Sequence, residues 1–291
     1  MASAKEIRIR LTSVKNTRQI TRAMKMVAAA KLRQAQDAII SARPFSIKIE
    51  EVLKDLAWSE SDSPVHPLLQ GRPVRKVLLV VLTSDRGLCG GFNSSIIKST
   101  EVALAETKKR AEAVSVAFIG RKAHQYFKNR DISIYKNYSE VMSNVTFAVA
   151  KEIADELMGL YLDGTFDEIR FIYNEFKSAI AQDVVSKQFL PIQFPHVSPN
   201  QSGLESKVDF LYEPNKQDIF KLLLPRHFHT QVHRSLLESL ASEHGARMSA
   251  MEAATKNAGE MIKALTLAYN RLRQGAITNE LIEIVSGAEA L

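Results

Sequence analysis

The sequence has one cysteine and no long apolar run, and each shortage removes a class of protein. With Cys89 as the only thiol, the chain cannot form a disulfide within itself, so no disulfide framework holds the fold together. A membrane-spanning helix needs about 18–20 consecutive apolar residues, whereas the longest apolar run, Val77–Leu82, suits only a buried strand. We therefore expect no direct membrane span.

Proline is also absent from residues 226–291, and that stretch carries the spacing of one long helix. Its apolar residues recur at steps that alternate between three and four, which is the pattern of a coiled-coil seam. At about 1.5 Å per residue the helix would be roughly 90–100 Å long, far longer than a compact domain is wide. The seam positions are Leu237, Leu240, Met251, Ala254, Ala258, Met261, Leu265, Ala268 and Leu272.

Residues 1–58 predict a second long helix, kinked at Pro44. A narrow apolar seam cannot hold a long helix in water by itself, so we expect the two helices to pack as an antiparallel coiled coil. The N-terminal seam is Ala35, Ile39, Ala42, Ile49, Leu53 and Leu56. Small residues should keep the pair thin, and they are Ala23, Ala28, Ala29, Ala30 and Ala35 on one helix and Ala250, Ala253, Ala254 and Ala258 on the other.

Acidic residues are almost missing from residues 1–35, which hold nine basic side chains and one acid, Glu6. Because the whole chain has a net charge of +7, all of its excess positive charge lies in this segment. Such a one-sided helix favours an acidic partner, namely nucleic acid, anionic lipid or acidic protein loops, over a merely solvated face. A mitochondrial transit peptide has a similar composition, but it has no reason to run in phase into an apolar seam.

Between the two helices the sequence period changes to alternating strands and helices. The predicted order is strand 77–83, helix 93–109, strand 114–119, a short helix, strand 132–135, helix 144–162 and an antiparallel pair of strands, 169–176 and 184–192. This order predicts a Rossmann-like α/β domain with mostly parallel strands. The fold class is therefore mixed α+β, with an α/β domain at 75–195 inserted between coiled-coil helices at 1–58 and 209–291.

The most distinctive local motif is the glycine-rich turn Gly87–Gly91, between a predicted strand and a predicted helix. Free backbone N–H groups at such a turn favour anions, but the motif matches neither the dinucleotide fingerprint nor the phosphate-binding loop with its lysine. Cys89 would act as a nucleophile only with a base, and His124 is the only nearby histidine in the sequence. We favour a tight connection between the two elements, which leaves no catalytic residue.

Two other functions compete on these features alone. A nucleic-acid or membrane-surface protein would bind phosphates with the basic helix, and a small α/β enzyme would use Cys89 or the glycine turn. No metal site or cofactor is predicted, because His227, His229 and His233 have no carboxylate or cysteine beside them at metal-ligand spacing. Neither function accounts for two long helices with apolar seams at the two ends of the chain.

Motifs along the whole chain resemble those of the gamma subunit of F-type ATP synthases, the rotary and proton-translocating kind, of bacterial type. The matching segments are Lys5–Arg8, Asn16–Met24, Met26–Ala29, Ser84–Gly91, Phe210–Pro214, Ala246–Met251, Asn270–Gln274 and Glu280–Ala288. The family's mature start falls at Lys5, which implies that no transit peptide precedes it and points to a bacterial protein or an already processed one. Cys89 alone cannot supply the regulatory cysteine pair of chloroplast-type members.

The resemblance implies a non-catalytic central rotor shaft. Such a shaft couples ion flow through the membrane rotor ring to ATP synthesis or hydrolysis at the beta subunits, and it regulates ATPase activity. The implied partners are three alpha and three beta subunits around the shaft, the epsilon subunit and the c subunits of the rotor ring, without nucleic acid and without a cofactor. The implied location is peripheral, on the cytoplasmic face of the bacterial inner membrane.

The same resemblance implies three groups of site residues. Residues expected to contact beta subunits are Arg8, Arg18, Arg22, Met24, Lys25, Arg247, Arg273, Gln274 and Thr278. Tyr212 and Glu213 are expected in the foot that faces epsilon and the rotor ring. The apolar tail expected in a sleeve at the top of the ring is Ile282, Ile284, Val285 and Leu291.

Overall fold

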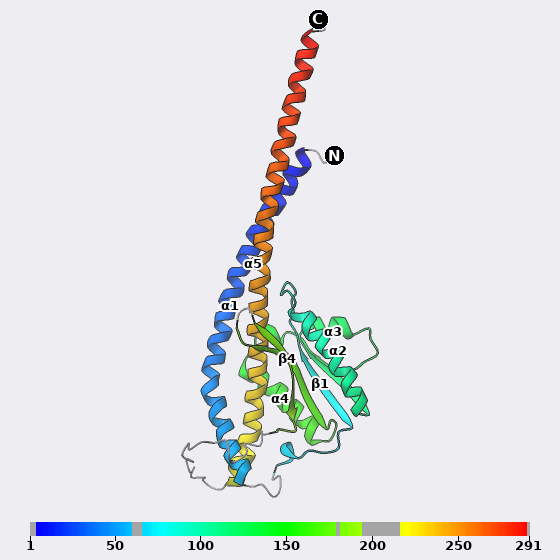
Figure 1. The fold of residues 1–291 in the computed structure, drawn as a ribbon. Helices are drawn as coiled ribbons and strands as arrows, with labels where there is room; N and C mark the ends of the chain where they lie inside the picture. The colour runs from blue at the N-terminus through cyan, green and yellow to red at the C-terminus, as the bar shows by residue number, and fades with distance from the viewer. Residues whose placement is uncertain (1–3, 60–65, 179–180, 194–215, 290–291) are drawn as a thin grey trace, which may run out of the picture. The chain divides into compact units, whose positions relative to one another are not determined.

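The computed structural model describes residues 4–59, 66–178, 181–193 and 216–289 (Figure 1). The chain divides into two compact units, which are treated separately here. The helix-pair unit comprises residues 1–30 and 247–291, and the sheet unit comprises residues 31–246. Two long helices, α1 (Ala4–Ser59) and α5 (Lys216–Glu289), contribute residues to both units.

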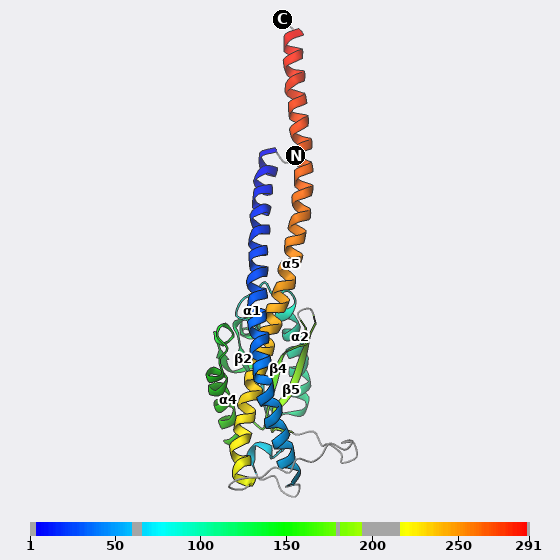
Figure 2. The same ribbon diagram turned by 90° about the vertical axis from the view of Figure 1, so that its left-hand side faces the viewer.

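In the helix-pair unit, α1 and α5 run in opposite directions (Figure 2). Three contacts fix their alignment. From one contact to the next along the pair, the residue number rises along α1 and falls along α5. Thr21 hydrogen bonds to Thr255, Lys25 forms an ion pair with Glu252, and Arg18 lies against Gly259. The predicted antiparallel coiled coil is thereby confirmed in this unit.

The seam of the helix pair consists of positions spaced alternately by three and four residues, most of them buried or half-buried. On α1 they are Ile7, Leu11, Val14, Arg18, Thr21, Lys25 and Ala28. On α5 they are Met251, Thr255, Ala258, Ile262, Leu265, Tyr269 and Leu272.

This seam corrects part of the predicted one. Met251, Ala258, Leu265 and Leu272 were placed rightly, but Met261 is 52% exposed, and Ile262 takes the seam position instead. The cause is that apolar residues stand both three and four positions after Ala258. The apolar pattern alone therefore does not decide which of them faces the other helix. The alanine prediction is also partly wrong, because Ala23, Ala30 and Ala253 are exposed.

The sheet unit is built on one five-stranded sheet with the order β3-β2-β1-β4-β5. The first four strands are parallel and β5 pairs antiparallel to β4, as the alternation of elements predicts. Their bounds are β1 Lys76–Leu82, β2 Ala113–Ile119, β3 Ser133–Tyr138, β4 Glu168–Phe176 and β5 Gln182–Leu190. Strand β1 is apolar and buried from Val77 to Leu82, because a central parallel strand is covered on both faces.

Helices cover both faces of this sheet. One face packs against α2 (Phe92–Arg110) and α3 (Arg121–Phe127), which lie beside β1 in Figure 1. The other face packs against α4 (Phe147–Leu162) and against buried residues of α1 and α5 such as Leu53 and Phe228. Short 3-10 turns occur at η1 (Pro67–Leu69) and η2 (Val141–Ser143).

Three predicted elements need corrected boundaries. Strand β3 runs to Tyr138, three residues past its predicted end, and β5 begins and ends two residues earlier than predicted. Helix α4 begins at Phe147, because the Thr146 hydroxyl accepts a hydrogen bond from the backbone N–H of Val149 and caps the helix there. Asn144 instead ends η2. Within the described ranges, no helix combines the length and the apolar character that a membrane crossing requires.

Candidate interaction surface

The outward face of α1 in the helix-pair unit carries large apolar side chains. Ile9, Ile20, Met26 and Val27 are each between 57% and 63% exposed. Ile9, Ile20 and Val27 lie on one face of the helix, which makes this face the candidate interaction surface. The sequence did contain the signal, since Ile9, Ile20 and Val27 lie eleven and seven residues apart, but the prediction followed only the inner seam.

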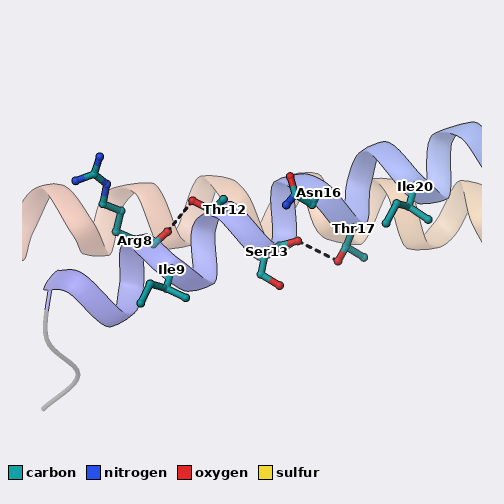
Figure 3. A pocket seen from close by; sticks show the side chains of 7 residues that line it. All are labelled: Arg8, Ile9, Thr12, Ser13, Asn16, Thr17 and Ile20. Atoms are coloured by element: carbon teal, nitrogen blue, oxygen red, sulfur yellow. Dashed lines mark hydrogen bonds between the residues drawn. The ribbon is translucent and has the colours of Figure 1, made fainter.

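Two of these residues flank a shallow groove of about 610 Å³ along α1, shown in Figure 3. The groove is lined by Arg8, Ile9, Thr12, Ser13, Asn16, Thr17 and Ile20. The hydroxyls of Thr12 and Thr17 donate hydrogen bonds to carbonyl oxygens one turn earlier on the same helix, at 3.1 and 3.0 Å. Because these donors are satisfied within α1, the groove offers apolar groups, the Ser13 hydroxyl, an arginine and an asparagine to a partner.

The predicted beta-contact residues on α1 fall into two sets. Arg8 and Arg22 are exposed and available on the surface. Met24 is half-buried, and Lys25 is occupied within the helix pair, where its Nζ lies 2.7 Å from Glu252 Oε1. Arg18 is exposed, but its guanidinium also lies against the backbone at Gly259.

On α5 the predicted contact residues also differ in exposure. Arg273, Gln274 and Thr278 are exposed, and the Thr278 hydroxyl donates to the carbonyl oxygen of Gln274 at 3.0 Å. Arg247, at the start of this part of α5, is half-buried and already engaged in an interaction within the chain.

The apolar tail of α5 is exposed at Ile282, Ile284 and Val285, to between 55% and 68%. The sequence prediction missed Ile277 and Leu281, which are also exposed and stand one turn apart before the tail. Leu291, and the foot residues Tyr212 and Glu213, lie outside the described residues.

The glycine turn is closed by hydrogen bonds of Asn93. The Asn93 side-chain oxygen accepts from the backbone N–H of Ser84 at 3.0 Å, and its amide nitrogen lies 3.1 Å from the buried Cys89 sulfur. His124 packs edge-on against Phe118 with ring centroids 5.9 Å apart. The Cys89 contact described here is therefore with a neutral amide, and the ring of His124, the base that the enzyme alternative considered, packs against Phe118.

The histidines of α5 pack the helix against α4. His229 Nε2 lies 2.6 Å from Asp155 Oδ1, and His233 meets the Phe147 ring edge-on at 5.5 Å. Burial lowers the pKa of His233, which favours its neutral form in this contact. Over the ranges that the structure describes, no group of three or more His, Cys, Asp or Glu side chains is arranged to hold a metal ion.

Two long antiparallel helices with an exposed outer surface, joined in one chain to a mostly parallel sheet unit, define a stalk-type protein. A family model described as ATP synthase matches residues 3–291. The chain belongs to this family, and specifically to its gamma chains, as the resemblance of its motifs implied.

Two relatives illustrate the match. The ATP synthase gamma chain of Geobacter metallireducens is 50% identical, with 100% of this chain and 99% of that protein covered. The ATP synthase gamma chain of Anaeromyxobacter sp. strain Fw109-5 is 52% identical, with both chains covered completely.

Solved structures share the fold. A chain in the central stalk and c-ring structure of the Tetrahymena thermophila mitochondrial ATP synthase aligns with a TM-score of 0.60 and 25% identity, over 81% of this chain and 99% of that one. A chain in the OSCP/F1/c-ring structure of the Euglena gracilis mitochondrial enzyme aligns with a TM-score of 0.67 and 19% identity, over 99% and 94%.

Proposed function

We propose that the chain is the central rotor shaft of a bacterial ATP synthase and couples ion flow through a membrane rotor ring to ATP synthesis or hydrolysis at beta subunits. The observation that carries the proposal is the helix pair, whose outer surface holds exposed basic and apolar side chains along its length. Full-length identity of about half to gamma chains supports it. The shaft itself makes and breaks no bond, so its effect is a shift in the populations of beta conformations.

The partners in this proposal are three alpha and three beta subunits around the helix pair, an epsilon subunit and the c subunits of the rotor ring. The chain would then be peripheral to the membrane, on its cytoplasmic face. We assign α1 and α5 to the shaft, and the domain 75–195, with Tyr212 and Glu213, to the foot.

The surface of the helix pair suits contacts that form and break repeatedly. Arg8, Arg22 and Arg273 are exposed cations, and an exposed ion pair contributes at most about 1 kcal/mol. The shallow groove beside Ile9 and Ile20 adds apolar contact without a deep socket. Weak contacts of both kinds let a beta subunit distinguish orientations of the shaft without holding one of them permanently.

The far end of α5 suits an apolar sleeve. Ile277, Leu281 and Ile284 are spaced by four and three residues, beginning five residues after the seam residue Leu272, and all three are at least 48% exposed. In the register of Thr21 and Thr255, Ala4 is the counterpart of Leu272, so this stretch extends past the first described residue of α1. We propose that alpha and beta subunits supply the apolar surface that covers it.

The test is reconstitution with alpha, beta and epsilon subunits, followed by ATP hydrolysis and ATP-driven proton pumping in the same vesicles. Deletion of residues 1–30 removes the α1 part of the helix-pair unit and should abolish coupled pumping. The control variant Lys108→Ala with Lys109→Ala removes exposed charge from α2 and should pump normally. Proton pumping that survives the deletion would refute the shaft function.

A nucleic-acid or membrane-surface function makes a different prediction. The full chain would then bind DNA or anionic vesicles strongly at low salt, and binding would fall steeply as salt rises. Tight, salt-dependent binding together with normal pumping after the deletion would favour that alternative.

A further inference from the structure

Three consecutive seam positions of α1 are polar, although a seam of this kind is ordinarily apolar. They are Arg18, Thr21 and Lys25, and they interrupt a line that is otherwise formed by Ile7, Leu11, Val14 and Ala28. All three side chains meet α5. They thus form a polar segment of the seam, in which Thr21 is buried while Arg18 and the Lys25–Glu252 pair stay partly open to solvent.

Each contact in this segment is specific. The Thr21 and Thr255 hydroxyl oxygens are 2.8 Å apart, and Thr21 is only 8% exposed. Lys25 Nζ lies 2.7 Å from Glu252 Oε1. A methyl group built at Gly259 would stand 3.9 Å from Arg18 Nε, an ordinary van der Waals distance, so the guanidinium lies beside α5 at this point.

We propose that Thr21 and Lys25 are positioning residues that hold α1 and α5 in a single register. The neighbouring seam residues Ala28 and Ala258 are small and give the helices few interlocking knobs. A polar residue inside a coiled-coil seam specifies register at some cost in stability, because a shifted register replaces its polar contact across the seam by an apolar one.

The sequence shows why a shift of one heptad is disfavoured. In one direction Thr21 would face Ile262 and Lys25 would face Gly259, so both would lose their partners on α5, although the Thr21 hydroxyl keeps its hydrogen bond to the Arg18 carbonyl oxygen within α1. In the other direction Arg18 would gain Glu252, but Thr21 would face Met248 and Lys25 would face Gly245. Only the observed register satisfies the threonine pair and the lysine together.

The consequence for function rests on the proposed shaft. A slip of seven residues moves α5 along α1 by roughly 10 Å. Arg273 and Gln274 would then be displaced along the helix axis relative to Arg8 and Arg22. The two sets of side chains would no longer match the contact positions of one surrounding ring. The polar segment would thereby keep the two helices acting as one body under load.

Disulfide trapping in the full chain tests the register without alpha or beta subunits, so its outcome is independent of the shaft function. The parent carries Cys89→Ser. A Val14→Cys and Ile262→Cys pair reports the observed register, since both positions lie one heptad from Thr21 and Thr255. Val14→Cys with Tyr269→Cys, and Leu11→Cys with Ala258→Cys, report the two slipped registers.

In the parent we expect trapping only at 14/262. With Thr21→Val, Thr255→Val and Lys25→Ala together, trapping of a slipped pair should rise about tenfold. The control, Thr266→Val with Lys263→Ala, removes the same types of group from exposed positions of α5 and should trap like the parent. Lys25→Glu should promote slippage, and adding Glu252→Lys should restore the observed register.

Several results would overturn the proposal. If the triple variant traps only 14/262 at the parental rate, the apolar seam sets the register alone. If Lys25→Glu is not rescued by Glu252→Lys, the ion pair has no positioning role. Failure of the parent itself to trap 14/262 would refute the register from which the inference starts.

Discussion

Gly120 lies so close to Thr83 that a methyl group built on its Cα would stand 2.7 Å from the Thr83 carbonyl carbon. Its φ of +95° is also a conformation that other residues rarely adopt. The contact joins the turn after β2 to the turn after β1, where Thr83 N–H donates to the Ile119 carbonyl oxygen at 2.8 Å. No side chain fits between these two backbones.

We predict that Gly120→Ala lowers the free energy of unfolding by at least about 2 kcal/mol, from overlap and backbone strain together. Urea denaturation of the full chain measures this. Gly159→Ala is the matched control, because nothing lies within 4 Å of that position in α4 and alanine is the better helix former. Equal stability of the two variants would mean that the turn is not as close as described.

Glu168 is 3% exposed and receives both arms of the Arg110 guanidinium at 2.7 Å, together with Arg170 Nε at 3.1 Å. Burial by itself would raise the pKa of Glu168, but the hydrogen bonds and charges of the two arginines outweigh it and lower the pKa below its usual value. The ionised form is therefore favoured in the folded state.

A lowered pKa gives stability that is present above the unfolded-state pKa of about 4.3 and is lost as pH falls through the folded-state value. We predict that Glu168→Gln costs about 2–4 kcal/mol at pH 7, and that the loss shrinks in acid. Denaturation at pH 7 and in a series below pH 5 checks this. Glu101→Gln, at the exposed pair with Arg130, should change stability by less than about 1 kcal/mol at every pH.

Cys89 is buried, and the partners identified for its sulfur, Asn93 and Ser84, are neutral. We predict that Cys89→Ser leaves ATP hydrolysis and proton pumping within about twofold of the parent, because a serine hydroxyl keeps a polar atom near Asn93. Asn93→Ala should instead lower stability, since it removes the bonds that close the turn. Loss of most activity in an intact Cys89→Ser complex would assign chemistry to this turn.

Arg273 is exposed beside Leu272 of the seam, so its guanidinium is free to reach a carboxylate of a surrounding subunit. We predict that Arg273→Ala lowers turnover more than it lowers assembly, and that Arg273→Glu lowers turnover further because an acidic surface would repel it. Hydrolysis and pumping in the same vesicles measure both effects. Lys263→Ala, also exposed on α5, is the charge control, and parental rates in both Arg273 variants would exclude this contact.

The elements of the sheet unit were predictable because their signals are local. Six consecutive apolar residues in β1 indicated a strand covered on both faces, and the glycine turn marked the start of α2 within a residue. The start of α4 was missed because two capping residues, Asn144 and Thr146, compete there. Only the hydrogen bond to Val149 decides between them.

The sequence predicted an antiparallel helix pair, but it did not decide which residues of each helix face the other. Apolar spacing revealed α5, yet Met261 and Ile262 fit the period equally well, and the choice depends on the opposite helix. The polar seam residues were missed for a related reason. Arg18, Thr21 and Lys25 look like solvated residues in the sequence, and they become seam residues only when Gly259, Thr255 and Glu252 face them.

The change from two helices to one near Leu272 also sets how this unit deforms under load. Up to that residue, a twist must bend α1 and α5 together, and the contacts between them resist it. From Arg273 to Glu289, α5 carries the same torque without a partner helix among the described residues, because α1 begins at Ala4, opposite Leu272. The paired segment therefore has the higher torsional stiffness and the single segment the lower one. Under a given torque, most of the twist occurs in the single segment, where Ile277 and Leu281 are exposed.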